Sequence, residues 1–173
     1  MNALVWFSHP PDYAKLAESV EHCRKLDPSA RRIVVIESAH ERPDVDAEII
    51  TRDFSRGRHL DGEEAVRGVA ATLAEIDADL TVKIDSDMMP SRAFWLDGAT
   101  VFQRFNNSFV GLYALPKVAF PIIRQCIAEQ PKPGHHEAQA IASRGLIICR
   151  ALSIPINLTR TPEGVYFPKV LTT

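Results

Sequence analysis

The chain has 173 residues, 46% of them hydrophobic and 24% charged, which is enough for one domain with its own core. It carries 20 lysines and arginines against 22 aspartates and glutamates, a formal net charge of −2. Duplex nucleic acid usually draws a basic surface, so this balance predicts no nucleic acid partner. The three cysteines lie far apart without a CxxC pair, which predicts free thiols in a reducing compartment.

Nothing in the sequence indicates export or membrane insertion. The first residues, MNALVWFSHPP, lack the cationic lead of a signal peptide. No run of about 20 apolar residues occurs, so we expect no transmembrane segment. Because no linker, repeat or low-complexity tract interrupts the chain, residues 1–173 are predicted to form a single domain of a cytoplasmic protein.

The first part of the chain alternates strand-like runs with helical spacing. Ala3–Phe7 is an apolar run that Ser8-His9-Pro10-Pro11 ends, which is typical of a buried strand. Apolar residues then recur at helical spacing over residues 12–26, and the β-branched residues from Ile33 to Ile36 predict a second buried strand. Residues 48–54 alternate weakly and are predicted to form a third strand.

The alternation continues after Asp61, where the clearest helix of the chain begins. Its apolar face consists of Ala65, Val69, Leu73 and Ile76. Further strands are predicted at residues 80–84 and 106–115, and further helices at residues 118–129 and 137–152. This order predicts an α/β fold with three layers, helix–sheet–helix, around a mostly parallel central sheet.

Two aspartates, Asp85 and Asp87, directly follow the predicted buried strand at residues 80–84. Ligands of open α/β sheets gather at the carboxyl ends of the strands. Two neighbouring carboxylates repel each other unless a cation or a proton joins them, and Mg²⁺ or Mn²⁺ is a suitable cation. The sequence therefore predicts a divalent metal site here; the alternative is that the aspartates form a solvated turn.

The segment ADLTVKIDSDMMP resembles the strand and DxD motif of glycosyltransferases with the GT-A fold. ALVWFSHPP and IVVIES resemble the first two strands of that family, and NSFVGLYAL resembles its acceptor-side strand, so the resemblance covers roughly residues 1–152. It implies a GT-A-like domain that moves a sugar from a nucleotide-diphosphate donor to a hydroxyl acceptor of unknown identity. It also implies Mn²⁺ or Mg²⁺ as the cofactor.

The resemblance implies a role for several residues. Asp85 would face the metal and the nucleotide ribose, and Asp87 would ligate the metal. Ser8 and Glu37, at the ends of the first two strands, would contact the nucleotide. Glu137, at a predicted helix start, stands where many inverting members keep an acidic general base.

Two interpretations are possible for each of three further charged residues, Arg56, Arg58 and Lys83. Arg56 and Arg58 lie just before the long helix, where bidentate arginines and a helix N-terminus suit a diphosphate. The alternative is a solvated charged loop. Lys83, inside the strand before the aspartates, either faces the diphosphate or pairs with a carboxylate.

A different class of protein also fits the sequence: a non-catalytic GT-A-like module that binds a nucleotide or a partner protein. Its support is that no histidine follows His136 to complete a metal site, and that the C-terminal part is short for the family. A sugar nucleotidyltransferase would instead need a glycine-rich phosphate loop after the first strand, whereas SHPPDY contains no glycine.

Overall fold

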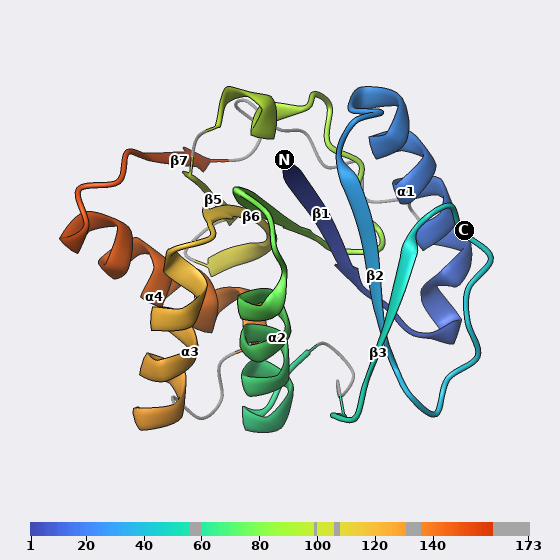
Figure 1. The fold of residues 1–173 in the computed structure, drawn as a ribbon, viewed down its shortest axis with the longest axis horizontal. Coiled ribbons are helices and arrows are strands. Elements are labelled where there is room, and N and C mark those ends of the chain that lie inside the picture. Colours follow the sequence, from blue (N-terminus) through green and yellow to red (C-terminus); the bar gives the residue numbers. More distant parts are fainter. Residues whose placement is uncertain (56–59, 99, 106–107, 131–135, 161–173) are drawn as a thin grey trace.

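The computed structural model describes residues 1–55, 60–98, 100–105, 108–130 and 136–160. Strands and helices alternate along most of this length (Figure 1). They are β1 (Asn2–Phe7), α1 (Tyr13–Leu26), β2 (Arg31–Glu37), β3 (Glu48–Arg52), α2 (Glu63–Glu75), β4 (Leu80–Ile84), β5 (Thr100–Phe105), β6 (Ser108–Pro116), α3 (Ala119–Glu129), α4 (Glu137–Ala151) and β7 (Ile156–Arg160), with short 3-10 helices at Pro10–Asp12 and Phe94–Asp97.

The strands form one seven-stranded sheet in the order β3-β2-β1-β4-β6-β5-β7. The first four strands are parallel to one another, β6 runs antiparallel to both β4 and β5, and β7 is parallel to β5. The predicted mostly parallel sheet is thus confirmed. Because β1 lies between β2 and β4, the carboxyl ends of these three strands lie side by side.

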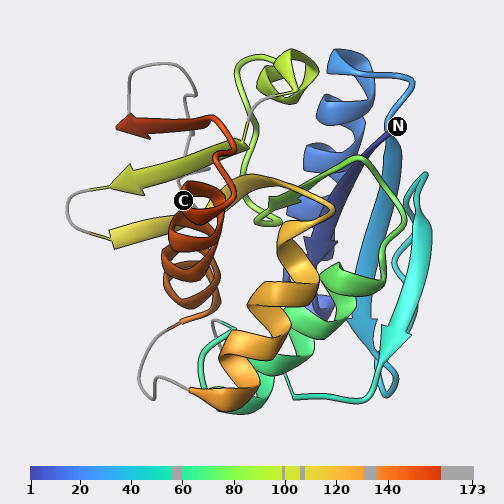
Figure 2. The ribbon, with the colours of Figure 1, turned by 60° about the vertical axis from the view of Figure 1, so that its left-hand side comes forward.

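Alternating side chains of β1 divide the core into two halves. Ala3, Val5 and Phe7 belong to one apolar cluster with α2, α3 and α4, while Leu4 and Trp6 belong to another with α1. Figures 1 and 2 show α2, α3 and α4 on one side of the sheet and α1 on the other. Strands that are buried on both faces have apolar residues at successive positions, so they are easy to recognise in the sequence. The predicted three layers are confirmed.

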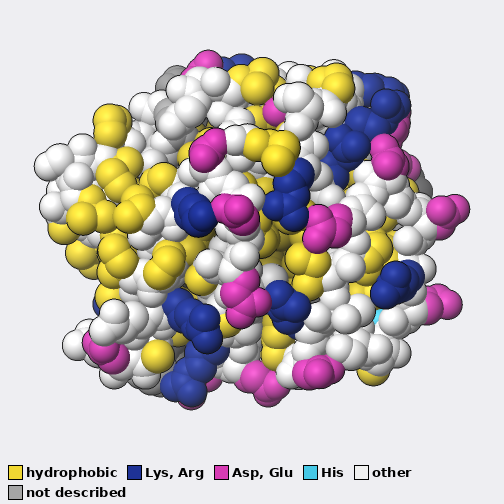
Figure 3. Space-filling view, viewed as in Figure 1, with side chains coloured by type: hydrophobic (Ala, Val, Ile, Leu, Met, Phe, Trp, Pro, Cys, Tyr) yellow, Lys and Arg dark blue, Asp and Glu magenta, His cyan; other side chains and the backbone are white. Residues whose placement is uncertain are grey.

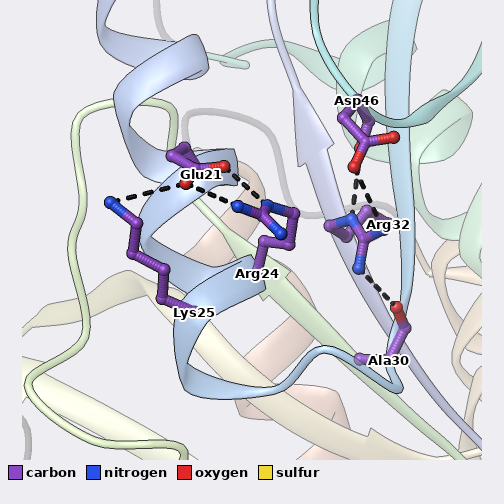
Figure 4. Close-up of polar contacts among 6 residues, drawn as sticks. All are labelled: Glu21, Arg24, Lys25, Ala30, Arg32 and Asp46. Atoms are coloured by element: carbon purple, nitrogen blue, oxygen red, sulfur yellow. Dashed lines mark hydrogen bonds and ion pairs between the residues drawn. The ribbon is translucent and has the colours of Figure 1, made fainter.

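Ion pairs order the surface around α1 (Figure 4). Arg24 donates to both carboxylate oxygens of Glu21, at 2.6 and 2.8 Å, and the Arg24 hydrogen bonds lower the pKa of Glu21 to about 2. Arg32 on β2 lies 3.4 Å from a carboxylate oxygen of Asp46, in the loop before β3. Exposed pairs of this kind add little stability each. Figure 3 shows basic and acidic side chains interspersed over one face of the molecule, in keeping with the small net charge.

Two predicted boundaries differ from the structure for packing reasons. The third strand ends at Arg52 rather than at Phe54, because the ring of Phe54 packs onto α2 where Gly68 leaves room for it. Helix α2 begins at Glu63 rather than at Asp61, since Gly62 has a φ of 93°, outside the helical region. Strands β5 and β7 were not predicted at all.

The cysteines are free, as predicted. Cys23 and Cys149 are buried and Cys126 is half-buried. Within the described part of the chain, no helix combines the length and the apolar character that crossing a membrane requires.

Candidate functional site

The Asp85-Ser86-Asp87 turn lies at the carboxyl end of β4, an interior strand between β1 and β6. The N–H of Met88 donates to the carbonyl of Asp85 at 3.0 Å and closes the turn. Asp87 is exposed, Asp85 is half-buried and Ser86 is buried. The predicted place of the two aspartates in the fold is confirmed.

A buried ion-pair network lies directly beneath this turn. The ammonium of Lys83 is paired with Oδ1 of Asp85 and lies 3.2 Å from Oε2 of Glu137. The hydroxyl of Tyr113 donates to Oε1 of Glu137. The side chains of Lys83 and Glu137 are only 1% and 3% exposed. Of the two readings for Lys83, the pairing with carboxylates is confirmed.

Burial and charge act in opposite directions on this network. Burial alone would lower the pKa of the Lys83 ammonium, but the carboxylates of Asp85 and Glu137 outweigh it and hold that pKa above its usual value. Burial, followed by the charge of Glu137, raises the pKa of the Tyr113 hydroxyl well above its usual value. Lys83 is therefore a charged cation and Tyr113 a neutral donor at neutral pH.

Gly111 on β6 makes room for the carboxylate of Asp85. A Cβ atom built on Gly111 would lie 1.9 Å from Oδ2 of Asp85 and 2.2 Å from its Cγ. Any larger residue would collide with the carboxylate. The sequence analysis missed both Gly111 and Tyr113, although a glycine inside a strand is a known signal of a close approach.

A hollow lies next to the turn, at the carboxyl ends of β1, β2 and β3. It is a shallow hollow with a free volume of about 10 Å³, open to solvent, and is lined by Phe7, Ser8, Val35, Ile36, Glu37, Arg52, Phe54 and Leu60. The hydroxyl of Ser86 donates to the hydroxyl of Ser8 at 3.0 Å. One hydrogen bond thus joins the wall of the hollow to the aspartate turn.

The hollow brings together two of the predicted nucleotide contacts, Ser8 and Glu37. Ser8 is only 1% exposed, and its N–H donates to the carbonyl of Val35 at 3.0 Å. The neighbouring Arg52 also lines the hollow and is paired with Glu75 on α2 at 2.9 Å. The predicted diphosphate ligands Arg56 and Arg58 lie outside the described residues.

Glu137 is the first residue of α4, at the helix start expected from the sequence, and its ion pair with Lys83 brings it next to the turn. The preceding His136 caps the helix, since its side chain accepts the N–H of Gln139 at 3.4 Å. The N–H of Glu137 donates to the carbonyl of Leu60, 3.0 Å away, in the wall of the hollow. A base role for Glu137 stays a prediction, since both of its carboxylate oxygens are engaged in the network.

The donor atoms of the turn fit a particular kind of metal site. Among the described residues, no three His, Cys, Asp or Glu side chains are grouped as metal ligands. Mg²⁺ and Mn²⁺ often take only one or two protein carboxylates and complete their shell with phosphate and water oxygens. Asp85, with one oxygen on Lys83, and the exposed Asp87 fit an ion that arrives with a phosphate, rather than a cage made by the protein alone.

Comparison with known proteins identifies the fold. No protein-family model matches the sequence, and no curated protein matches it. Among solved structures, 2-C-methyl-D-erythritol 4-phosphate cytidylyltransferase from Thermus thermophilus matches with a TM-score of 0.54, at 11% identity over 94% of this chain and 90% of that chain. The chain thus shares the fold of that structure, an α/β fold with a seven-stranded, mostly parallel sheet.

Two further structures support this fold. A mycobacterial protein matches with a TM-score of 0.59, at 13% identity over 92% of this chain and 65% of that chain. The protein Aq1419 from Aquifex aeolicus matches with a TM-score of 0.51, at 10% identity over 94% of this chain and 87% of that chain. At such low identity the likeness shows the fold and not the activity.

Proposed function

We propose that the chain binds a nucleotide-diphosphate sugar at the carboxyl ends of β1, β2 and β4 and, with Mn²⁺ or Mg²⁺, transfers the sugar to a hydroxyl acceptor. The observation that carries the proposal is the position of the aspartate turn beside the hollow, at neighbouring strand ends, with Ser86 hydrogen-bonded to Ser8 in the wall of the hollow. A nucleoside over the hollow would direct its diphosphate toward Asp85 and Asp87.

A nucleoside would lie over the hollow rather than inside it, since its free volume of about 10 Å³ is too small for a base. Phe7 and Phe54 provide apolar surface, and the carboxylate of Glu37 provides an acceptor for N–H or O–H groups of a base or ribose. A divalent ion held by Asp85 and Asp87 would neutralise the charge that develops on a leaving diphosphate.

The acceptor hydroxyl must give up a proton to a base as it attacks the donor. Glu137 is the residue that the resemblance suggests, and a base must come within hydrogen-bond distance of the proton it takes. Its 3% exposure and its contacts with Lys83 and Tyr113 favour a holding role over direct contact with an acceptor.

Two other functions have support from specific observations. A non-catalytic nucleotide-binding module agrees with the engagement of both carboxylate oxygens of Glu137 in the buried network. A nucleotidyltransferase agrees with the fold shared with the cytidylyltransferase from Thermus thermophilus. Against the latter, a 3-10 turn at Pro10–Asp12, rather than a glycine-rich loop, follows β1.

One assay separates the three functions. The protein is incubated with Mn²⁺ and a panel of nucleotide sugars and nucleoside triphosphates, and the products are measured. We expect a nucleoside diphosphate from a nucleotide sugar, and no product with Asp87→Ala. The matched control is Asp79→Ala, which removes an exposed aspartate just before β4, at its opposite end, and is expected to act like the wild type.

The other outcomes of this assay point to the other functions. Metal-dependent nucleotide binding without any product would indicate a binding module. Pyrophosphate released from a nucleoside triphosphate would indicate a nucleotidyltransferase. Either result overturns the transfer of a sugar.

A further inference from the structure

We propose that Lys83 is an internal counter-cation of the Asp85-Ser86-Asp87 turn, which holds Asp85 in place and weakens its attraction for a free divalent ion. A metal would then bind the turn together with a diphosphate and not before it. This inference rests on the proposed function, in which Asp85 and Asp87 meet a metal, and it assigns Lys83 and Glu137 to positioning.

The first support is the placement of the charge. Lys83 comes from β4 itself, two residues before Asp85, and its ammonium is paired with Oδ1 of that aspartate. Its side chain is 1% exposed, so it has no access to a ligand in solvent. Its charge reaches the ligand side of the site only through Asp85.

The second support is the fixed orientation of the Asp85 carboxylate. Oδ1 is paired with Lys83, and the whole carboxylate packs where a Cβ atom on Gly111 would lie, 1.9 Å from Oδ2 and 2.3 Å from Oδ1. A carboxylate held on both sides is ready for a ligand without rearrangement. Because Lys83 helps to fix this orientation, a positive charge already contacts the Asp85 carboxylate before any metal binds.

The third support is the second partner of Lys83. Glu137, 3.2 Å from the ammonium, is buried and divides the attraction of the cation between two carboxylates. Tyr113 fixes the other oxygen of Glu137. The positive charge that acts on Asp85 therefore depends on Glu137 as well as on Lys83. Removing Lys83 or Glu137 should change the affinity of the turn for a cation, each in a defined direction.

Coulomb's law gives these directions. Like charges a few ångströms apart repel strongly where water is excluded, so the Lys83 ammonium opposes a second cation at Asp85. A diphosphate brings enough negative charge to offset this repulsion. Metal and diphosphate should therefore each raise the affinity for the other, as linkage requires.

The test measures free Mn²⁺ by electron paramagnetic resonance, first without any nucleotide. The double variant Lys83→Met with Glu137→Gln removes the cation and avoids leaving a buried, unpaired carboxylate. We expect it to bind Mn²⁺ several-fold more tightly than the wild type, because it loses the ammonium that contacts Asp85, an effect that the loss of the Glu137 carboxylate offsets only in part. We expect Glu137→Gln alone to bind Mn²⁺ more weakly, since the whole charge of Lys83 then acts on Asp85.

These opposite signs separate a charge effect from a merely structural one. If the network only supports the fold, both variants should lose affinity together. Lys117→Met is the matched control, since Lys117 is exposed, pairs with Asp77 and lies at the opposite end of β4 from the turn, and it should leave the Mn²⁺ affinity unchanged. Should the double variant fail to fold, Lys83→Gln with Glu137→Gln keeps an amide donor and carries the same expectation.

A second measurement adds a nucleoside diphosphate, UDP or GDP, to the same proteins. We expect the nucleotide to raise the Mn²⁺ affinity of the wild type more than that of the double variant. Equal affinities of wild type and double variant without nucleotide, or losses in both variants, would overturn the inference. The Mn²⁺-only arm needs no sugar donor, so the inference can fail while sugar transfer is observed, and sugar transfer can fail while the inference holds.

Discussion

The backbone of Gly111 lies directly against the carboxylate of Asp85, so closely that a Cβ atom on Gly111 would approach Oδ2 to 1.9 Å. The antiparallel strand β6 thereby forms one wall of the aspartate turn that ends β4. This contact requires glycine for space and not for backbone conformation, since Gly111 is not among the glycines with positive φ in the described residues.

Gly111→Ala should therefore damage the site more than the fold. The added methyl group must push the Asp85 carboxylate away, and overpacking of this kind costs about 1–3 kcal/mol. We expect metal-dependent nucleotide binding to weaken by about tenfold or more, as measured by isothermal titration calorimetry.

Gly145→Ala is the matched control for this prediction. It adds a methyl group that would lie 3.0 Å from the ring of Phe102 on β5, which is separated from β4 by β6, and it does not approach the carboxylate of Asp85. Nucleotide binding should be retained in this variant. Wild-type affinity in Gly111→Ala would show that the orientation of Asp85 does not matter for the ligand.

The stability of the buried network can be tested by removing its cation. Lys83→Met leaves Glu137 buried without its charge partner, which should lower the free energy of unfolding by about 3–5 kcal/mol. The double variant Lys83→Met with Glu137→Gln has no unpaired charge and should lose about 1 kcal/mol or less. Urea denaturation measures both; similar losses in the two variants would contradict the ion pair.

Tyr113 predicts a specific pH dependence of stability. Burial and Glu137 raise the pKa of the Tyr113 hydroxyl in the folded state, so unfolding releases a proton once the pH exceeds the unfolded value near ~10. The raised pKa of Lys83 acts in the same direction. The stability that both groups contribute is therefore fully present at neutral pH and is lost as the pH rises above ~10.

Tyr113→Phe is the test of this pH dependence. The variant should be less stable than the wild type at pH ~8 and should lose less stability between pH ~9 and ~11.5, in melting experiments across that range. Tyr13→Phe, which removes an exposed hydroxyl bonded to the carbonyl of Glu41, should change the slope less. Parallel curves for wild type and Tyr113→Phe would contradict the raised pKa.

The cysteines predict a pattern of thiol reactivity. Burial raises the pKa of the Cys23 thiol to about 12, and burial also raises that of Cys149 against the effect of a hydrogen bond with Thr100. Because the thiolate is the reactive form, a disulfide reagent at pH ~8 should label the half-buried Cys126 first and the other two only after unfolding. Cys126→Ala should remove the rapid reaction; rapid labelling that persists would contradict the burial of the others.

Much of the fold could be predicted from the sequence because the central strands are buried on both faces. The apolar runs ALVWF in β1 and IVVI in β2 stand out, and β4, LTVKI, is largely apolar and β-branched; each was found. Strands β5 and β7 were missed, because TVFQRF and INLTR mix polar and charged residues into short runs. Their pairing depends on neighbours that the local sequence does not reveal.

The candidate site was predictable only in part. Asp85 and Asp87 could be found because they stand together in the sequence at a strand end. The contact between Lys83 and Glu137 could not, because it depends on α4 packing across β4 and β6. The same holds for the capping of α4 by the side chain of His136, which was not predicted.

One backbone hydrogen bond links the start of α4, which carries the ion-pair network, to the wall of the hollow. The N–H of Glu137 is bonded to the carbonyl of Leu60, so the first turn of α4 touches both the ion-pair network and the lining of the hollow. The hollow and the ion-pair network beneath the aspartate turn are thus both in contact with the start of α4. A substitution that destabilises the first turn of α4 should therefore disturb both the hollow and the aspartate turn, even if the substituted residue contacts no ligand.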